Sequence, residues 1–263
     1  MKKYDLEDTT FIIPLRIDTI DRLENLLFCT NHLLKYFNTK ILILEADTRN
    51  RNILNKMLNK KITYVFREDK DPIFFRTSYI NKIVQATQTP YIAIWDADVI
   101  APVEQIISSI DLLRKDEADF VYPYKGLLLD VPTCIKNIYS KKENIHVLNK
   151  FSSGFHFMYG QNAVGGGFFT NRLKYIEAGM ENENFYGWGL EDGERFVRWH
   201  KLGYRISRVE GSLFHLFHER GMNSSVHSEA QSYFKTKEKV RITNMSKTLL
   251  LEEIQSWPQV KPL

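Results

Sequence analysis

The amino-acid sequence predicts an α/β fold with a mainly parallel central sheet and helices on both of its faces. The first observation is a set of short apolar segments with the length of buried strands, at residues 10–15, 40–45, 62–66, 91–95 and 120–124. The second is that helical patterns fill the intervals between them, and strands that alternate with helices favour parallel pairing. Because the 263 residues contain no repeat, low-complexity tract or linker, a single domain is expected.

Four helices are expected between these strands. The first begins after Asp18 or Thr19, either of which can cap it. Its expected apolar face consists of Ile20, Leu23, Leu27, Leu34 and Phe37. The others are marked by apolar residues within 53–58, 79–84 and 103–110. In such sheets ligands bind beyond the carboxyl ends of the strands, so the residues that follow each strand are the first candidates for chemistry.

The second half of the chain has a less regular pattern. Residues 126–160 give weak signals and are expected to form a flexible loop or lid. A short helix from about Asn171, a helix that Glu191 opens and a strand at 205–209 follow. The tail, residues 229–263, is expected to pack as a terminal helix through Leu249, Leu250 and Ile254.

Composition and charge exclude several classes of protein. The 36 Lys and Arg residues exceed the 32 Asp and Glu residues by four, too small an excess for a dedicated nucleic-acid binder, so no nucleic-acid partner is expected. The two cysteines, Cys29 and Cys134, lie far apart, which argues against a disulfide framework and a cysteine zinc site and fits a reducing compartment.

The sequence also bears on location. It has no apolar segment typical of a signal peptide or a spanning helix, so a cytoplasmic protein is expected, at most peripheral to the inner face of the cell membrane. The tail carries basic residues that fit either a solvated helix face or contact with an anionic membrane: Lys235, Lys237, Lys239, Arg241 and Lys247.

Two acidic residues directly follow the most apolar predicted strand. Asp96 and Asp98 would repel each other unless a cation lies nearby, and hard oxygen ligands suit Mg²⁺ or Mn²⁺ shared with substrate phosphates. The alternative is a pair of turn carboxylates. A second pair with the same spacing, Asp69 and Asp71, is a weaker candidate because Lys70 lies between its members.

His215 and His218 are a second candidate pair. Imidazoles three residues apart converge in a helical turn or tight bend but point to opposite faces of a flat strand. With a carboxylate they would suit Mn²⁺, Fe²⁺ or Zn²⁺, and the alternative is that both are core or capping residues.

A further candidate group surrounds a helix N-terminus. Glu191 and Asp192 fit either a favourable pair at the positive end of the helix dipole or a general base. Trp188 lies between two glycines, one of them Gly189, where an indole can form the wall of a sugar site. The run that begins with Gly165 and Gly166 either lets the backbone approach a phosphate or sugar or forms an ordinary turn.

Taken in order, these motifs resemble those of the β-1,4-galactosyltransferase-like family of inverting nucleotide-sugar glycosyltransferases, which have the GT-A fold, and of bacterial family 2 glycosyltransferases. The resemblance extends from about Phe11 to Arg220. It is carried by residues 12–16, Phe75-Arg76 with Asn81, the 96–98 triplet, the 165–170 segment, the 186–192 block and the 215–220 segment.

The resemblance implies roles for the site residues. Pro14 and Arg16 would contact the nucleotide, and Arg76 would line the donor pocket. Asp98 and His218 would bind Mn²⁺ or Mg²⁺. His215, which stands where galactosyltransferases of the family often have methionine, is a further candidate ligand.

The remaining roles concern the two sugars. Asp96 would support the metal ligand or bind the ribose, Asp192 would be the catalytic base, and Glu191 would bind the acceptor. Trp188 would separate the donor and acceptor sugars. One departure concerns the acceptor side, because Gly193 intervenes before the next acidic residue, Glu194.

The resemblance implies an enzyme that moves a hexose, galactose or N-acetylgalactosamine, from a UDP-sugar to a saccharide or lipid-linked saccharide in bacterial surface polysaccharide synthesis. A nucleotide-sugar-binding half, 9–125, would precede an acceptor half, 126–228. The alternatives are a nucleotidyltransferase, which would have glycine where Pro14-Leu15-Arg16 stands, and a catalytically inactive binding relative. A zinc hydrolase lacks support because the histidine pair has no HExxH glutamate.

Overall fold

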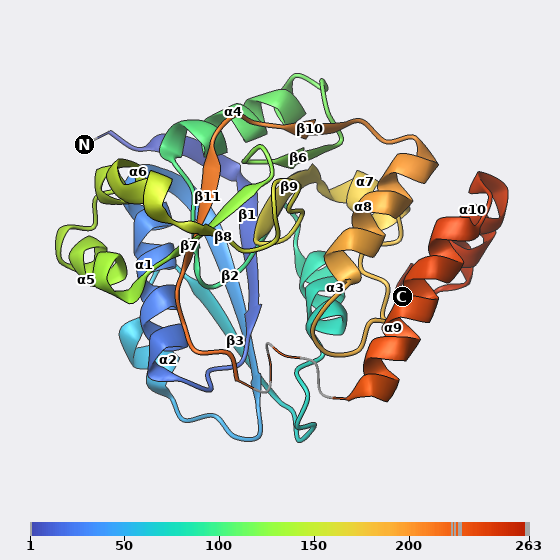
Figure 1. Cartoon of the computed structure of the whole chain (residues 1–263), viewed down its shortest axis with the longest axis horizontal. Helices are drawn as coiled ribbons and strands as arrows, with labels where there is room; N and C mark the ends of the chain where they lie inside the picture. Colours follow the sequence, from blue (N-terminus) through green and yellow to red (C-terminus); the bar gives the residue numbers. More distant parts are fainter. Residues whose placement is uncertain (1, 222, 224, 226–227, 261–263) are drawn as a thin grey trace.

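The protein folds into two sheets flanked by helices, which confirms the predicted fold class (Figure 1). The structure is a computed structural model that describes residues 2–221, 223, 225 and 228–260. The predicted domain, acceptor half and tail include some residues that lie outside the described ones: Met1, Met222, Ser224, residues 226–227 and residues 261–263. Within the described chain, buried apolar side chains from Leu6 to Trp257 form a continuous core.

The main sheet contains all the strands that the sequence predicts. Its order is β10-β6-β9-β4-β1-β2-β3. The strands are β1 (Tyr4–Leu15), β2 (Phe37–Asp47), β3 (Thr63–Glu68), β4 (Tyr91–Trp95), β6 (Phe120–Tyr122), β9 (Gly167–Asn171) and β10 (Ile206–Arg208). Pairing is parallel except at β9, which is antiparallel to both β4 and β6.

The predicted helices of the first half are present as α1 (Ile20–Tyr36), α2 (Ile53–Met57), α3 (Arg76–Ala86) and α4 (Val103–Arg114). The side chain of Thr19 caps α1 by accepting from Arg22 N. The prediction that Ile20 and Phe37 belong to its apolar face was wrong. Ile20 is 68% exposed, because the buried face is rotated toward Leu26 and Leu33, and Phe37 has extended backbone and starts β2.

A second sheet corrects the expected flexible loop. Its order is β5-β11-β7-β8, formed by β5 (Val99–Ile100), β11 (Ser212–Leu216), β7 (Leu127–Val131) and β8 (His156–Phe157). Residues 126–160 thus contain two strands, together with α5 (Thr133–Lys142), α6 (His146–Phe151) and a 3-10 turn, Ser152–Gly154. Val131 and Leu148 are fully buried, so this segment belongs to the core.

The C-terminal region forms a helical layer beside the sheet (Figure 1). It includes α7 (Arg172–Glu177), α8 (Glu191–Leu202), α9 (Glu229–Asn244), α10 (Lys247–Ser256) and a final 3-10 turn, Pro258–Val260. The tail therefore forms two helices rather than one. Leu250 and Ile254 are buried as expected, whereas Leu249 is 56% exposed. Among the described residues, no helix combines the length and apolar character needed to cross a membrane.

Candidate active site

The second sheet brings the two histidines to the acidic pair. Asp96 and Asp98 follow β4, and β5 begins directly after Asp98. β11 pairs with β5 in antiparallel register, and Leu216 N donates a hydrogen bond to Asp98 O at 2.7 Å. The end of β11, with His215 on the strand and His218 just beyond it, therefore lies against Asp98. Because His218 lies beyond the end of β11, it is not held to the opposite face of the strand, and both imidazoles reach the same carboxylate.

Asp98, His215 and His218 form a compact triad. His218 Nε2 lies 3.1 Å and His215 Nε2 lies 3.7 Å from Asp98 Oδ2. One donor atom from each residue lies within 4.8 Å of the others. A carboxylate oxygen with two imidazole nitrogens is a ligand set that suits Mn²⁺, with further coordination positions left for a substrate oxygen. The residues present therefore fit the metal ion that the sequence predicts.

Hydrogen bonds orient both rings toward Asp98. Each Nδ1 is engaged on the far side of its ring, at 2.9 Å from Asp130 Oδ1 for His215 and at 2.9 Å from Glu219 O for His218. Burial would lower the pKa of His218, but the Asp98 carboxylate outweighs it and raises that pKa. Burial would likewise raise the pKa of Asp98, but the two imidazoles lower it well below its usual range. His218 and Asp98 therefore stabilise each other's charged forms, and a cation bound between them would compete with the proton of His218.

Asp96 lies beside the triad but has a different partner. Its Oδ1 accepts a hydrogen bond of 2.5 Å from Arg76 Nη2. Burial raises the pKa of Asp96, and Asp98 and Asp192 raise it further while Arg76 opposes them. Burial would lower the pKa of Arg76, but the surrounding carboxylates raise it. This pairing accords with a supporting role for Asp96 rather than a direct ligand role.

The glycine run connects the acidic pair to the start of α8. Asp96 N donates to Gly166 O at 2.9 Å, and the Tyr124 hydroxyl donates to Gly165 O at 2.7 Å. A Cβ at Gly165 would lie 2.8 Å from Asp192 Oδ2. The absence of a side chain at Gly165 therefore lets the Asp192 carboxylate approach this backbone closely.

Trp188 contacts two basic side chains, one at its backbone carbonyl and one at its ring. The buried Lys235 ammonium on α9 donates to Trp188 O, and the Arg220 guanidinium lies 5.1 Å from the centre of the Trp188 ring. Gly189 has a φ of 107°, which the bend before α8 requires. Lys235 is 3% exposed, so it belongs neither to a solvated helix face nor to a membrane-facing one.

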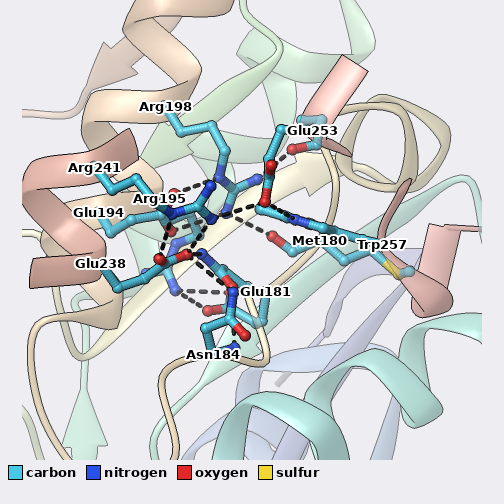
Figure 2. Close-up of polar contacts among 12 residues, drawn as sticks. Met180, Glu181, Asn184, Glu194, Arg195, Arg198, Glu238, Arg241, Glu253 and Trp257 are labelled. Carbon is cyan, nitrogen blue, oxygen red and sulfur yellow. Dashed lines mark hydrogen bonds and ion pairs between the residues drawn. The ribbon is translucent and has the colours of Figure 1, made fainter. Parts of the chain in front are cut away.

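A buried ion network supports the start of α8. Arg195 donates to both carboxylate oxygens of Glu181 at 2.8 and 2.9 Å (Figure 2). It also donates to Asp192 Oδ1 at 2.6 Å, which fixes the position of Asp192. Its guanidinium lies 4.5 Å from the centre of the Phe168 ring. Glu194 is buried and bound by Arg198, with Oε1 2.7 Å from Nε. The acidic residue after Gly193 therefore serves the fold of α8 rather than the site.

Replacing Arg195 with methionine is expected to destabilise the protein by about 3–5 kcal/mol, because Glu181 would stay buried without its partner. Urea unfolding followed by circular dichroism measures this change. Arg114→Met, which removes a more exposed pair with Asp8, should cost about 1 kcal/mol or less. Equal costs for the two variants would contradict the assigned role of Arg195.

Glu191 is buried beside Asp192, and it forms no ion pair with any residue that the structure describes. Burial and the Asp192 charge raise the pKa of Glu191 to about 7, and Arg76 offsets only part of this shift. Its Oε2 has no hydrogen-bond partner within the described part of the chain. A carboxyl group of this kind has a lone pair or a proton to offer to a ligand hydroxyl.

The raised pKa of Glu191 predicts that the stability of the fold decreases at high pH. Between its usual pKa of 4.5 and about 7, the folded state binds the proton more tightly than the unfolded state, so stability falls as pH rises through this range. Glu191→Gln should remove this loss and increase the free energy of unfolding by about 2 kcal/mol more at pH 8 than at pH 5. Urea unfolding at both pH values is the measurement, with the exposed Glu104→Gln as control. The same change at both pH values would refute the prediction.

A cavity of about 900 Å³, open to solvent, collects the predicted site residues. It is lined by every one of them except Gly189: Pro14, Arg16, Arg76, Asp96, Asp98, Gly165, Gly166, Trp188, Glu191, Asp192, His215 and His218. A second cavity, of about 1040 Å³, adjoins it and includes Gly189 and Lys235. The two cavities share Tyr159, Gly165, Trp188, Glu191 and Asp192.

Comparisons with known proteins agree with the fold described above. A sequence model described as the N-terminal domain of galactosyltransferase matches residues 146–220. A search of curated protein sequences found no significant match. The catalytic domain of Drosophila beta1,4-galactosyltransferase 7 in complex with xylobiose is 19% identical over 87% of this chain and 79% of its own, with a TM-score of 0.55.

Two further solved structures have the same fold. Residues 1–349 of S. aureus TarS, in complex with UDP-GlcNAc, are 12% identical over 94% of this chain and 71% of that chain, with a TM-score of 0.59. GalNAc-T7 with UDP, GalNAc and Mn²⁺ is 12% identical over 95% of this chain and 52% of that chain, also with a TM-score of 0.59. The resemblance to GT-A glycosyltransferases is confirmed. The matched family model and the Drosophila structure are both described as galactosyltransferases, within the class of enzyme that the sequence predicts.

Arg16 has structural partners that the resemblance to GT-A glycosyltransferases does not predict. The guanidinium of Arg16, expected at the nucleotide, donates to the carbonyls of Ala46, Asp71 and Pro72 and to the Asp69 carboxylate. Arg16 therefore also joins the ends of β1, β2 and the loop after β3.

Arg22, which sequence reasoning missed, lines the first cavity. Its position near the N-terminus of α1, where the helix dipole disfavours a cation, was the available signal.

Proposed function

We propose that this chain is a metal-dependent inverting glycosyltransferase that moves galactose or N-acetylgalactosamine from a UDP-sugar to a hydroxyl group of a saccharide. The observation that carries the proposal is that the Asp98–His215–His218 triad and the Glu191–Asp192 pair line one cavity. The solved relatives add support, since one contains UDP, GalNAc and Mn²⁺ and another contains UDP-GlcNAc.

The donor diphosphate would lie between the triad and two arginines. Arg22 Nη2 and Arg76 Nη1 are buried and have no hydrogen-bond partner among the described residues, and both side chains line the first cavity. Such donors are suited to phosphate oxygens. Bound to the triad, Mn²⁺ or Mg²⁺ would supply positive charge that stabilises the leaving diphosphate.

The acceptor would enter through the second cavity. Asp192 lies where the two cavities meet and is held by Arg195, so its free oxygen can take the proton of an acceptor hydroxyl. As that proton leaves, the hydroxyl oxygen forms a bond to C1 of the sugar, and the bond from C1 to the diphosphate breaks with its electron pair. Attack opposite the leaving group inverts C1. Trp188 and Tyr159, which line both cavities, would form the boundary between the sugars.

For the biological setting we propose bacterial surface polysaccharide synthesis in the cytoplasm. The acceptor would be a free or lipid-linked saccharide, with at most peripheral contact to the membrane. This setting depends on the resemblance to bacterial glycosyltransferases, and the absence of a membrane-crossing helix in the described chain is compatible with it.

Slow donor hydrolysis without an acceptor tests the enzymatic proposal. UDP-Gal and UDP-GalNAc are incubated with the protein and Mn²⁺, and released UDP is measured with and without a chelator. The proposal predicts UDP release that stops on chelation. Release of pyrophosphate from UTP and a sugar phosphate would instead indicate a nucleotidyltransferase, and donor binding without UDP release, even with saccharide acceptors, would indicate an inactive relative.

A further inference from the structure

His215 lies between the first cavity and a third one. Its Nε2 is directed toward Asp98, while its ring also lines a cavity of about 970 Å³ together with Asp130, His156 and Phe157. The other ring nitrogen, Nδ1, lies 2.9 Å from Asp130 Oδ1. Asp130 has no role in the function proposed above.

The second sheet places Asp130 beside His215. β7 is parallel to β11, and the register pairs Asp130 with His215. On its other side Asp130 is paired with His156 of β8. Residues paired across neighbouring strands project from the same face of a sheet, so the three side chains form one row with the carboxylate in the middle.

We propose that Asp130 is a positioning residue that holds His215 in the orientation needed to bind the metal ion, an inference that rests on the metal site of the proposed function. An ionised carboxylate only accepts hydrogen bonds, so the contact places the ring proton on Nδ1 and leaves the Nε2 lone pair for a cation. Without Asp130, either nitrogen can carry the proton. The third cavity also leaves the ring room to turn away from Asp98.

His218 shows the same arrangement built from the backbone. Its Nδ1 donates to the Glu219 carbonyl, so its Nε2 is also directed at Asp98. The chain thus orients His218 with a carbonyl group and His215 with a carboxylate. The negative charge of the carboxylate also makes the imidazole of His215 a stronger metal ligand. Of the two supports, Asp130 is the one that a side-chain substitution can remove.

Binding of Mn²⁺ in the presence of saturating UDP, measured by calorimetry and by the electron paramagnetic resonance signal of free Mn²⁺, tests this role. Asp130→Ala is expected to weaken Mn²⁺ binding about 10- to 100-fold. Asp130→Asn, which keeps a hydrogen-bond acceptor without the charge, should lose less. His156→Ala removes the other neighbour of Asp130 and should leave the affinity unchanged. Thermal unfolding without metal verifies that each variant is folded.

A double-mutant cycle then shows whether Asp130 acts through His215. In a His215→Ala background, Asp130→Ala should change the Mn²⁺ affinity by less than about 2-fold. Wild-type affinity in both Asp130 variants would overturn the inference, as would an equal loss in the two backgrounds. If the wild-type protein itself bound no Mn²⁺, the proposed metal-dependent function would fail, which is a different result.

Discussion

Asp192→Asn is expected to lower sugar transfer about 1,000-fold, because an amide cannot take the proton of the acceptor hydroxyl. Asparagine has the size of aspartate, and its oxygen can still accept the 2.6 Å hydrogen bond from Arg195. The position of the side chain should therefore survive while its basicity is lost. Donor and metal binding should stay within about 2-fold of wild type, because Asp192 is not a member of the triad and does not supply the arginine donors proposed for the diphosphate, Arg22 Nη2 and Arg76 Nη1.

Transfer is measured as UDP release in the presence of acceptor, and donor binding by calorimetry with Mn²⁺. Asp111→Asn, which neutralises a half-exposed carboxylate on α4, controls for the loss of one negative charge. Undiminished turnover of Asp192→Asn would rule out this residue as the base. A parallel loss of donor binding would instead assign it to the donor site.

Asp98→Asn is expected to abolish the effect of Mn²⁺ on UDP binding. Asp98 is the acidic member of the triad, and both imidazoles are directed at its Oδ2. An amide oxygen in its place carries no charge to offset the cation, so we expect Mn²⁺ affinity to fall more than about 100-fold. The arginines alone would then hold UDP, which should bind equally well with and without Mn²⁺.

Calorimetric titration of UDP with Mn²⁺ or a chelator measures this change. Asp71→Asn is a suitable control. It neutralises one carboxylate of the second acidic pair, Asp69 and Asp71, which lies outside the triad. A metal-dependent gain in UDP affinity that persists in Asp98→Asn would contradict the ligand assignment.

The main sheet and most of the candidate site could be predicted because each rests on local pattern. β4 is a continuous apolar run, and in a parallel sheet the residues after such a strand lie at the ligand-binding edge. Asp96, Asp98 and the residues that open α8 could therefore be identified from the sequence before their contacts were known.

The second sheet could not be predicted, because its strands are specified by partners far away in the chain. β5 and β8 have two residues each, too few for a periodic signal. Asp130 becomes informative only when β7 lies beside β11. The same limit applies to Lys235, whose burial depends on the packing of α9 against α8 and the Trp188 segment.

Arg16 shows a different limit. An arginine after the first strand resembles a phosphate ligand in the sequence, but its guanidinium is satisfied by three carbonyl groups and the Asp69 carboxylate. Arg22 and Arg76 each have a buried nitrogen without a hydrogen-bond partner among the described residues. Residue type alone does not show which guanidinium groups keep such donors for an anion.

The central claim is that this cavity binds a UDP-sugar through a metal ion. A thermal-shift panel of UDP-Gal, UDP-GalNAc, UDP-GlcNAc and GDP-mannose, each with Mn²⁺ or with a chelator, tests it most directly. We predict an increase in Tm with UDP-Gal or UDP-GalNAc that disappears on chelation. No increase with any UDP-sugar, or an increase that chelation leaves unchanged, would contradict the claim.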